Sequence, residues 1–145
     1  MTPKRAGIFI SLMGWGFIIF GVVFVTIAFS ALDGFAKAIS PLFDWTGLTA
    51  SDSLTRSARW FAAIMSGLSS GFGAFFVFIV APLLSHKDDI VFRTVKRGGL
   101  IAAGLWFVVD STGSVAAVVP SNVVMNCLFL ATFAVPLLLV KRNTA

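Results

Sequence analysis

Four long apolar runs dominate the pattern of hydrophobic and polar positions along this chain. They cover residues 8–29, 60–84, 98–119 and 122–140, and only the third contains a charged residue, Asp110. Each run has about 20 residues, the length that an α-helix needs to cross a hydrocarbon layer of roughly 30 Å. Lipid offers no partners to backbone N–H and C=O groups, so each run is predicted to be a helix. We therefore expect an all-α integral membrane protein, a single domain over residues 1–145 built as a bundle of four transmembrane helices.

The connector between the first and second runs carries a further helical pattern. Apolar residues recur at three- and four-residue steps from Leu32 to Phe43, with charged and hydroxyl residues between them. This periodicity predicts a short amphipathic helix on the outer surface of the membrane, interrupted at Pro41, with Trp45 as an interfacial anchor. A helix packed across the mouth of the bundle explains the same pattern equally well.

Composition agrees with the apolar runs. Hydrophobic residues make up 58% of the chain and charged residues only 12%, whereas a soluble domain has about 25% charged residues. The net charge of +5 does not indicate a nucleic-acid partner, because the charges sit in short segments between the apolar runs rather than in a basic stripe with interleaved aromatic residues. The expected partner is the lipid bilayer.

Basic residues fall mainly on one side of the predicted bundle. With four spans, the side that holds both termini carries eight of them: Lys4, Arg5, Lys87, Arg93, Lys96, Arg97, Lys141 and Arg142. The opposite side has three, Lys37, Arg56 and Arg59, balanced by three aspartates. The positive-inside rule then places the N- and C-termini in the cytoplasm. Size and charge asymmetry favour a bacterial inner membrane.

The same basic side is expected to contact anionic lipid. Each Lys or Arg near an anionic leaflet contributes roughly 1 kcal/mol of binding. The residues predicted to make these contacts are Lys4, Arg5, Arg93, Lys96, Arg97, Lys141 and Arg142. Setting the orientation of the spans is a sufficient role for them without any specific lipid site.

Small residues recur at four-residue spacing in the second run, at Ala63, Gly67 and Gly71. Because lipid tails are as apolar as Leu, helices in a membrane associate largely through close packing of such residues. We expect this row to pack against another helix of the same chain. The alternative is a face that joins two copies into a homo-oligomer.

Asp110 is the strongest candidate for chemistry. A carboxylate inside a span is costly, so it faces the interior of the bundle and has partners. Ser114 follows on the same helix face, and Asn122 and Asn126 share a face of the fourth helix. A tight turn at Pro120 joins the third and fourth runs, so these residues are expected to meet in one intramembrane polar cluster. Arg59, at the mouth of the second helix, is expected to reach down to Asp110 by extending its apolar stem.

Two interpretations of this cluster remain open. In the first, the cluster is a satisfied network that fixes the register of the helices. In the second, Asp110 binds a proton or another cation, and its affinity changes with access to one side. The first is favoured, because a carboxylate with an Arg nearby more often locks a structure than carries an ion.

Other reactive side chains are scarce. The chain has one His, one Cys, and no Tyr or Glu. A bis-histidine haem site and a zinc site within one chain are therefore excluded, and neither a metal nor a cofactor is expected. Met13, Met65 and Met125 are interpreted as packing residues. Size and span number resemble the small multidrug exporters in outline only, since their acidic residue in the first span has no counterpart here.

The leading functional hypothesis is a non-enzymatic membrane protein, either an accessory subunit of a larger complex or a scaffold. The alternative is a small proton- or cation-coupled transporter or channel built around Asp110. An enzyme is the least favoured, because acid–base pairs are absent from the predicted outer face.

Overall fold

The computed structural model describes residues 1–32, 34, 38, 56–116 and 119–142. Its long helices are α1 (Pro3–Phe24), α3 (Arg56–Phe75), α5 (Asp89–Ala116) and α6 (Pro120–Leu139). The 3-10 turns η1 (Val25–Ala28) and η2 (Ser30–Leu32) follow α1. A π-helical turn, η4 (Phe76–Val80), and the short α4 (Ala81–Leu83) continue α3. Every element among the described residues is helical.

The expectation of four long apolar helices is confirmed. The segments long and apolar enough to cross a membrane are Pro3–Ala28, Arg59–Leu83, Asp89–Ala116 and Ser121–Leu139. The amphipathic helix predicted from residue 31 onward falls almost entirely outside the described residues.

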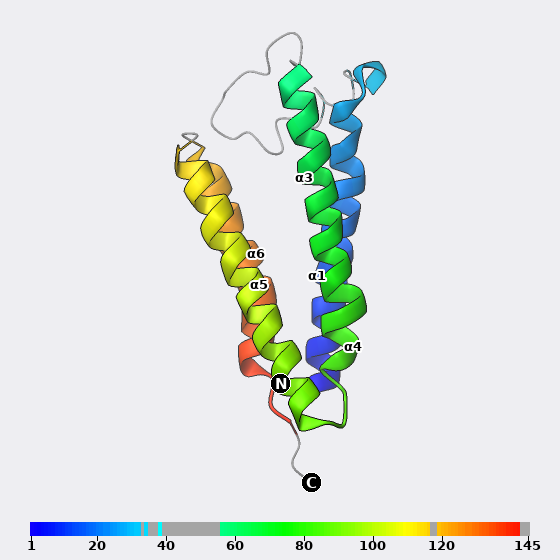
Figure 1. The fold of residues 1–145 in the computed structure, drawn as a ribbon, viewed down its shortest axis with the longest axis vertical. Helices are drawn as coiled ribbons and strands as arrows, with labels where there is room; N and C mark the ends of the chain where they lie inside the picture. The colour runs from blue at the N-terminus through cyan, green and yellow to red at the C-terminus, as the bar shows by residue number, and fades with distance from the viewer. Residues whose placement is uncertain (33, 35–37, 39–55, 117–118, 143–145) are drawn as a thin grey trace.

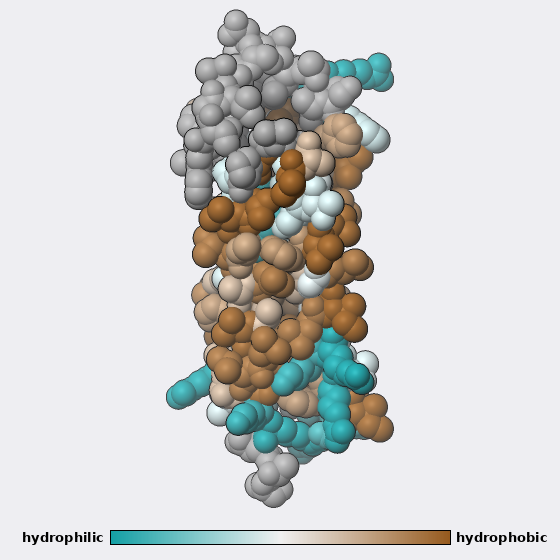
Figure 2. Space-filling model, turned by 90° about the vertical axis from the view of Figure 1, so that its left-hand side faces the viewer, coloured by the Kyte–Doolittle hydropathy of each residue, from teal (hydrophilic) through white to brown (hydrophobic). Residues whose placement is uncertain are grey.

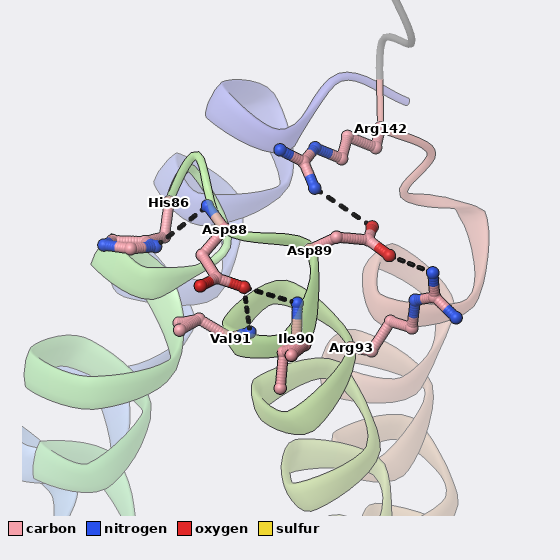
Figure 3. Close-up of polar contacts among 7 residues, drawn as sticks. All are labelled: His86, Asp88, Asp89, Ile90, Val91, Arg93 and Arg142. Atoms are coloured by element: carbon pink, nitrogen blue, oxygen red, sulfur yellow. Dashed lines mark hydrogen bonds and ion pairs between the residues drawn. The ribbon is translucent and has the colours of Figure 1, made fainter.

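Two helices begin well before their apolar runs because polar side chains cap them. Thr2 Oγ1 accepts a hydrogen bond from the Arg5 amide at 3.4 Å, ahead of Pro3 in the first turn of α1. Asp88 Oδ1 accepts from the amides of Ile90 and Val91 at 2.7 and 3.3 Å (Figure 3). These caps satisfy amides that the first helical turn leaves without partners. As a result, α5 starts at Asp89, although its apolar run starts only at Gly98.

The outer surface of the bundle is apolar along its middle. Figure 2 shows hydrophobic side chains over this zone and hydrophilic ones gathered at the end that holds the two termini. Ile8, Leu105 and Leu138 are each more than three-fifths exposed. Water-soluble monomers rarely expose large continuous apolar surfaces. A surface of this kind suits a hydrocarbon solvent.

The four long helices form two antiparallel hairpins, α1 with α3 and α5 with α6 (Figure 1). Glycines allow the first pair to approach closely. A Cβ added at Gly14 would lie 2.9 Å from the carbonyl oxygen of Gly73 and 2.7 Å from Val77 Cγ2. Gly21 is similarly close to Ser66 and Ser70. Backbone-to-backbone contact of this kind is how membrane helices gain packing energy without a hydrophobic driving force.

The row Ala63, Gly67 and Gly71 does not form this interface. Gly67 and Gly71 are exposed, and a Cβ at either would meet nothing within 4 Å. The face of α3 turned toward α1 carries Ser66, Ser70 and Gly73 instead, because the glycines of α1 lie opposite these residues. The expected close approach therefore occurs on α3, but on a neighbouring face.

The two hairpins are joined at the end that holds both termini. Ile10, Val80 and Leu137 are buried there in one core cluster. The Met1 amino group, just ahead of α1, donates to the carbonyl oxygen of Leu139 at 3.1 Å, and the Lys141 amide donates to the carbonyl oxygen of Met1 at 3.1 Å. Within the α5–α6 hairpin at the same end, Figure 3 shows Arg142 paired with Asp89 at 3.0 Å.

At the opposite end the α1–α3 pair and the α5–α6 pair diverge (Figure 1). Between the two ends lies a cluster of aromatic rings. Phe17 contacts Phe72, Trp106, Phe129 and Phe133, with ring centroids 4.9–5.9 Å apart. These rings fill the space between the hairpins at mid-height. Above them, the separation of the hairpins leaves room for a site.

We predict that Gly14→Ala destabilises the bundle, because the added methyl group meets Val77 and the Gly73 carbonyl. Overpacking of this kind typically costs about 1–3 kcal/mol. The matched control is Gly67→Ala, which adds the same methyl group to open space. Thermal unfolding in detergent, followed by circular dichroism, should show a lower midpoint for the first variant only. Equal midpoints would disprove the close approach of α1 and α3.

Candidate functional site

Asp110 lies near the diverging end of α5 and is hydrogen-bonded by two amides from α6. Asn122 Nδ2 donates to Asp110 Oδ2 at 2.9 Å, and Asn126 Nδ2 donates to the same oxygen at 2.5 Å. The two asparagines are one helical turn apart, so both point from one face of α6 toward α5. The short connection between these helices places Asp110 opposite them.

Two serines extend the cluster. Asn122 Nδ2 also donates to Ser114 Oγ at 2.7 Å, and Ser114 Oγ donates to the backbone carbonyl of Asp110 at 2.7 Å. Asn126, only 2% exposed, lies 3.2 Å from Ser111 Oγ. The structure thus brings together Asp110, Ser114, Asn122 and Asn126, and adds Ser111, which the sequence analysis had not included.

The structure does not bring Arg59 to Asp110. Arg59 Nη1 donates to the backbone carbonyl of Ile27 at 3.3 Å, which ties the start of α3 to the end of the α1 segment. Arg59 belongs to the α1–α3 hairpin, whereas Asp110 belongs to α5, and the hairpins diverge at this level. Within the described part of the chain, no cationic side chain forms an ion pair with Asp110.

One oxygen of the Asp110 carboxylate is accessible. Both amide donors bind Oδ2, and none of the hydrogen bonds among the described residues reaches Oδ1. Within the same residues, the one buried side-chain polar atom without a partner is Ser121 Oγ. Since Oδ1 has no partner and is not buried, it is open to a small molecule or ion.

A cavity of about 590 Å³ is lined in part by Asp110. All four long helices line it: Leu12, Met13, Gly16, Phe17, Phe20 and Phe24 from α1, Met65 and Ser69 from α3, Trp106 and Asp110 from α5, and Asn122, Met125, Asn126, Leu128, Phe129 and Thr132 from α6. Asp110 is the one charged residue among them. The volume is within the range of small-molecule sites, roughly 300–1,000 Å³.

Aromatic rings form part of the cavity wall. Trp106 lies one helical turn from Asp110, and its ring centroid is 5.9 Å from Phe17 and 6.3 Å from Phe129. The three methionines interpreted as packing residues, Met13, Met65 and Met125, all line the cavity wall. No sequence pattern predicts the cavity, because its size depends on the angle between the hairpins.

The basic residues expected at anionic lipid lie at the end that holds the termini, far along α5 from Asp110. Lys4, Arg5, Arg97 and Lys141 are exposed. The other three have protein partners. Arg93 and Arg142 pair with Asp89 (Figure 3), and Lys96 donates to carbonyl groups at the end of α6. The Arg142 pair and the Lys96 hydrogen bonds connect α5 to the end of α6, so part of the basic set has a structural role.

Groups of side chains suited to a metal ion are not found among the described residues. Comparison with family models, with curated proteins and with solved structures gives no match for this chain. The function is therefore argued from the geometry of the site.

We predict that Asn126→Leu lowers stability, because Asp110 and Ser111 then lose a buried amide donor. Leaving buried polar groups unsatisfied typically costs about 1–3 kcal/mol. The control is Thr112→Val on α5, the helix of Asp110, where an exposed hydroxyl bonds only the Val108 carbonyl of its own helix. A midpoint of thermal unfolding that falls equally in both variants would argue against the α5–α6 network.

Proposed function

We propose that this chain is a small carrier of the bacterial inner membrane in which Asp110 binds a proton or another cation between two helical hairpins. The observation that supports this most directly is an accessible carboxylate oxygen inside an apolar zone. Among the described residues, no cationic side chain forms an ion pair with this carboxylate. An ionised carboxylate in such surroundings is costly unless its charge is compensated. The amide donors of Asn122 and Asn126 stabilise the charge but do not neutralise it. A cation from outside the chain completes the site.

The arrangement of the hairpins supports movement of that cation. Each hairpin is held by its own contacts, glycine packing in one and the polar cluster in the other. They meet tightly at the end with the termini and diverge at the other. Rocking one hairpin against the other would change access to Asp110 without unpacking either. Motion of packed helical units around a central site is a common principle of membrane carriers.

A second candidate is an accessory subunit or scaffold of a membrane complex. The outward-facing Gly67 and Gly71 favour it, because a partner helix or a second copy can approach closely over residues without side chains. In this case Asp110 serves only to hold α5 against α6.

These candidates differ in what Asp110→Asn does. Asparagine removes the charge but keeps the size, so the carrier hypothesis predicts a folded protein with strongly reduced proton flux. Flux is measured in proteoliposomes that contain a pH-sensitive dye, after a pH gradient is imposed. Asp110→Glu, which keeps the carboxylate, is expected to retain part of the flux. Unfolding of Asp110→Asn would favour the scaffold, and unchanged flux in a folded protein would exclude proton transport through Asp110.

The proposed orientation places both termini and the eight basic residues in the cytoplasm, as the positive-inside rule requires. We predict that a reporter active only in the cytoplasm is active at either terminus when the protein is produced in a bacterium. Replacing Lys4, Arg5, Arg97 and Lys141 with Gln should weaken this preference. Reporters on opposite sides would contradict a four-span topology.

A further inference from the structure

Building on the proposed cation site at Asp110, we propose that its substrates are organic monocations with a bulky apolar body. The cationic group would lie at Asp110 Oδ1, and the apolar body would occupy the cavity between the hairpins. This assignment goes beyond the choice between a proton and a cation, because it follows from the walls of the cavity rather than from the carboxylate alone.

The size of the cavity argues against the smallest cations. A proton needs no space beside the carboxylate, and a metal ion without its water shell needs several oxygen ligands at short distance. The cavity instead offers about 590 Å³, bounded mainly by aliphatic, aromatic and methionine side chains. Such a space is filled favourably by an apolar body, which leaves only the charged group to be compensated.

The chemistry of the walls favours a positive ligand. Among the described residues that line the cavity, Asp110 is the one that is charged, and its carboxylate would repel an anion. The faces of Trp106, Phe17 and Phe129 are electron-rich and attract cations placed over them. Met13 and Met125 have flexible, polarisable side chains that adapt to differently shaped ligands. Charge selection and tolerance of shape are therefore built into the same cavity.

The rim indicates how such a ligand enters. Leu12 and Leu128 line the cavity and are also 63% and 56% exposed. They belong to α1 and α6, whose exposed side chains form part of the apolar outer surface. Gly16 lies between Leu12 and Phe17 in the sequence of α1 and also lines the cavity. Because it has no side chain, it does not block the cavity beside Leu12. A ligand dissolved in the bilayer would therefore reach Asp110 from the side.

The test compares two ions of the same shape and opposite charge, tetraphenylphosphonium and tetraphenylborate, added to separate samples of the purified protein in detergent. Quenching of Trp fluorescence, corrected with protein-free micelles, reports binding. We expect saturable binding of the phosphonium and none of the borate. Asp110→Asn should weaken phosphonium binding at least about tenfold, a loss of about 1.4 kcal/mol.

A second pair of variants tests the cavity independently of Asp110. Gly16→Phe places a ring in the cavity from a position where a Cβ meets nothing within 4 Å, so the fold should tolerate it. Gly67→Phe makes the same change on the outward face of α3 and does not reach the cavity. We expect only Gly16→Phe to weaken phosphonium binding.

The outcomes separate this inference from the proposed function. Equal binding of the two ions, or equal effects of Gly16→Phe and Gly67→Phe, would overturn the inference. Absent phosphonium binding with a proton flux that still depends on Asp110 would overturn the substrate class and leave the carrier standing. If the flux is also independent of Asp110, both proposals are wrong.

Discussion

Apolar side chains supply no hydrogen bonds to a carboxylate, and this constraint organises the α5–α6 hairpin around Asp110. Two asparagines from α6 donate to one of its oxygens, and serines of α5 complete the network. Removal of one donor would weaken the compensation of this carboxylate in surroundings where an unpaired polar group is costly. The network therefore fixes which faces of α5 and α6 meet. It also leaves the second carboxylate oxygen without an amide donor, on a residue that lines the cavity.

The α1–α3 hairpin is held by a different interaction. Gly14, Gly21 and Gly73 bring the two backbones close enough for extensive van der Waals contact. Each hairpin is thus complete in itself, and the contacts between them are concentrated in the aromatic cluster and at the end with the termini. A cavity at the diverging end follows from this division. A fold with one continuous core would have filled that volume with side chains.

The apolar runs were sufficient to predict four helices, because length and hydropathy set the requirement for crossing a membrane. Helical spacing and the tight turn before α6 were sufficient to place Asn122 and Asn126 opposite Asp110. Other features depend on tertiary geometry that spacing does not encode. Small residues occur on two faces of α3, and only the glycines of α1 select the face with Gly73. The angle between the hairpins separates Arg59 from Asp110 and creates the cavity.

The side-chain amides of Asn122 and Asn126 both donate to the carboxylate of Asp110, and the site depends on these two hydrogen bonds. The chain has three asparagines and no glutamine, so selective ¹⁵N labelling of asparagine gives a simple NMR spectrum of side-chain amides in nanodiscs. We predict that Asp110→Ala shifts two of the three amide signals and speeds their exchange with water. If all three signals keep their positions and exchange rates, Asp110 is not bound by these amides and the account of the site is wrong.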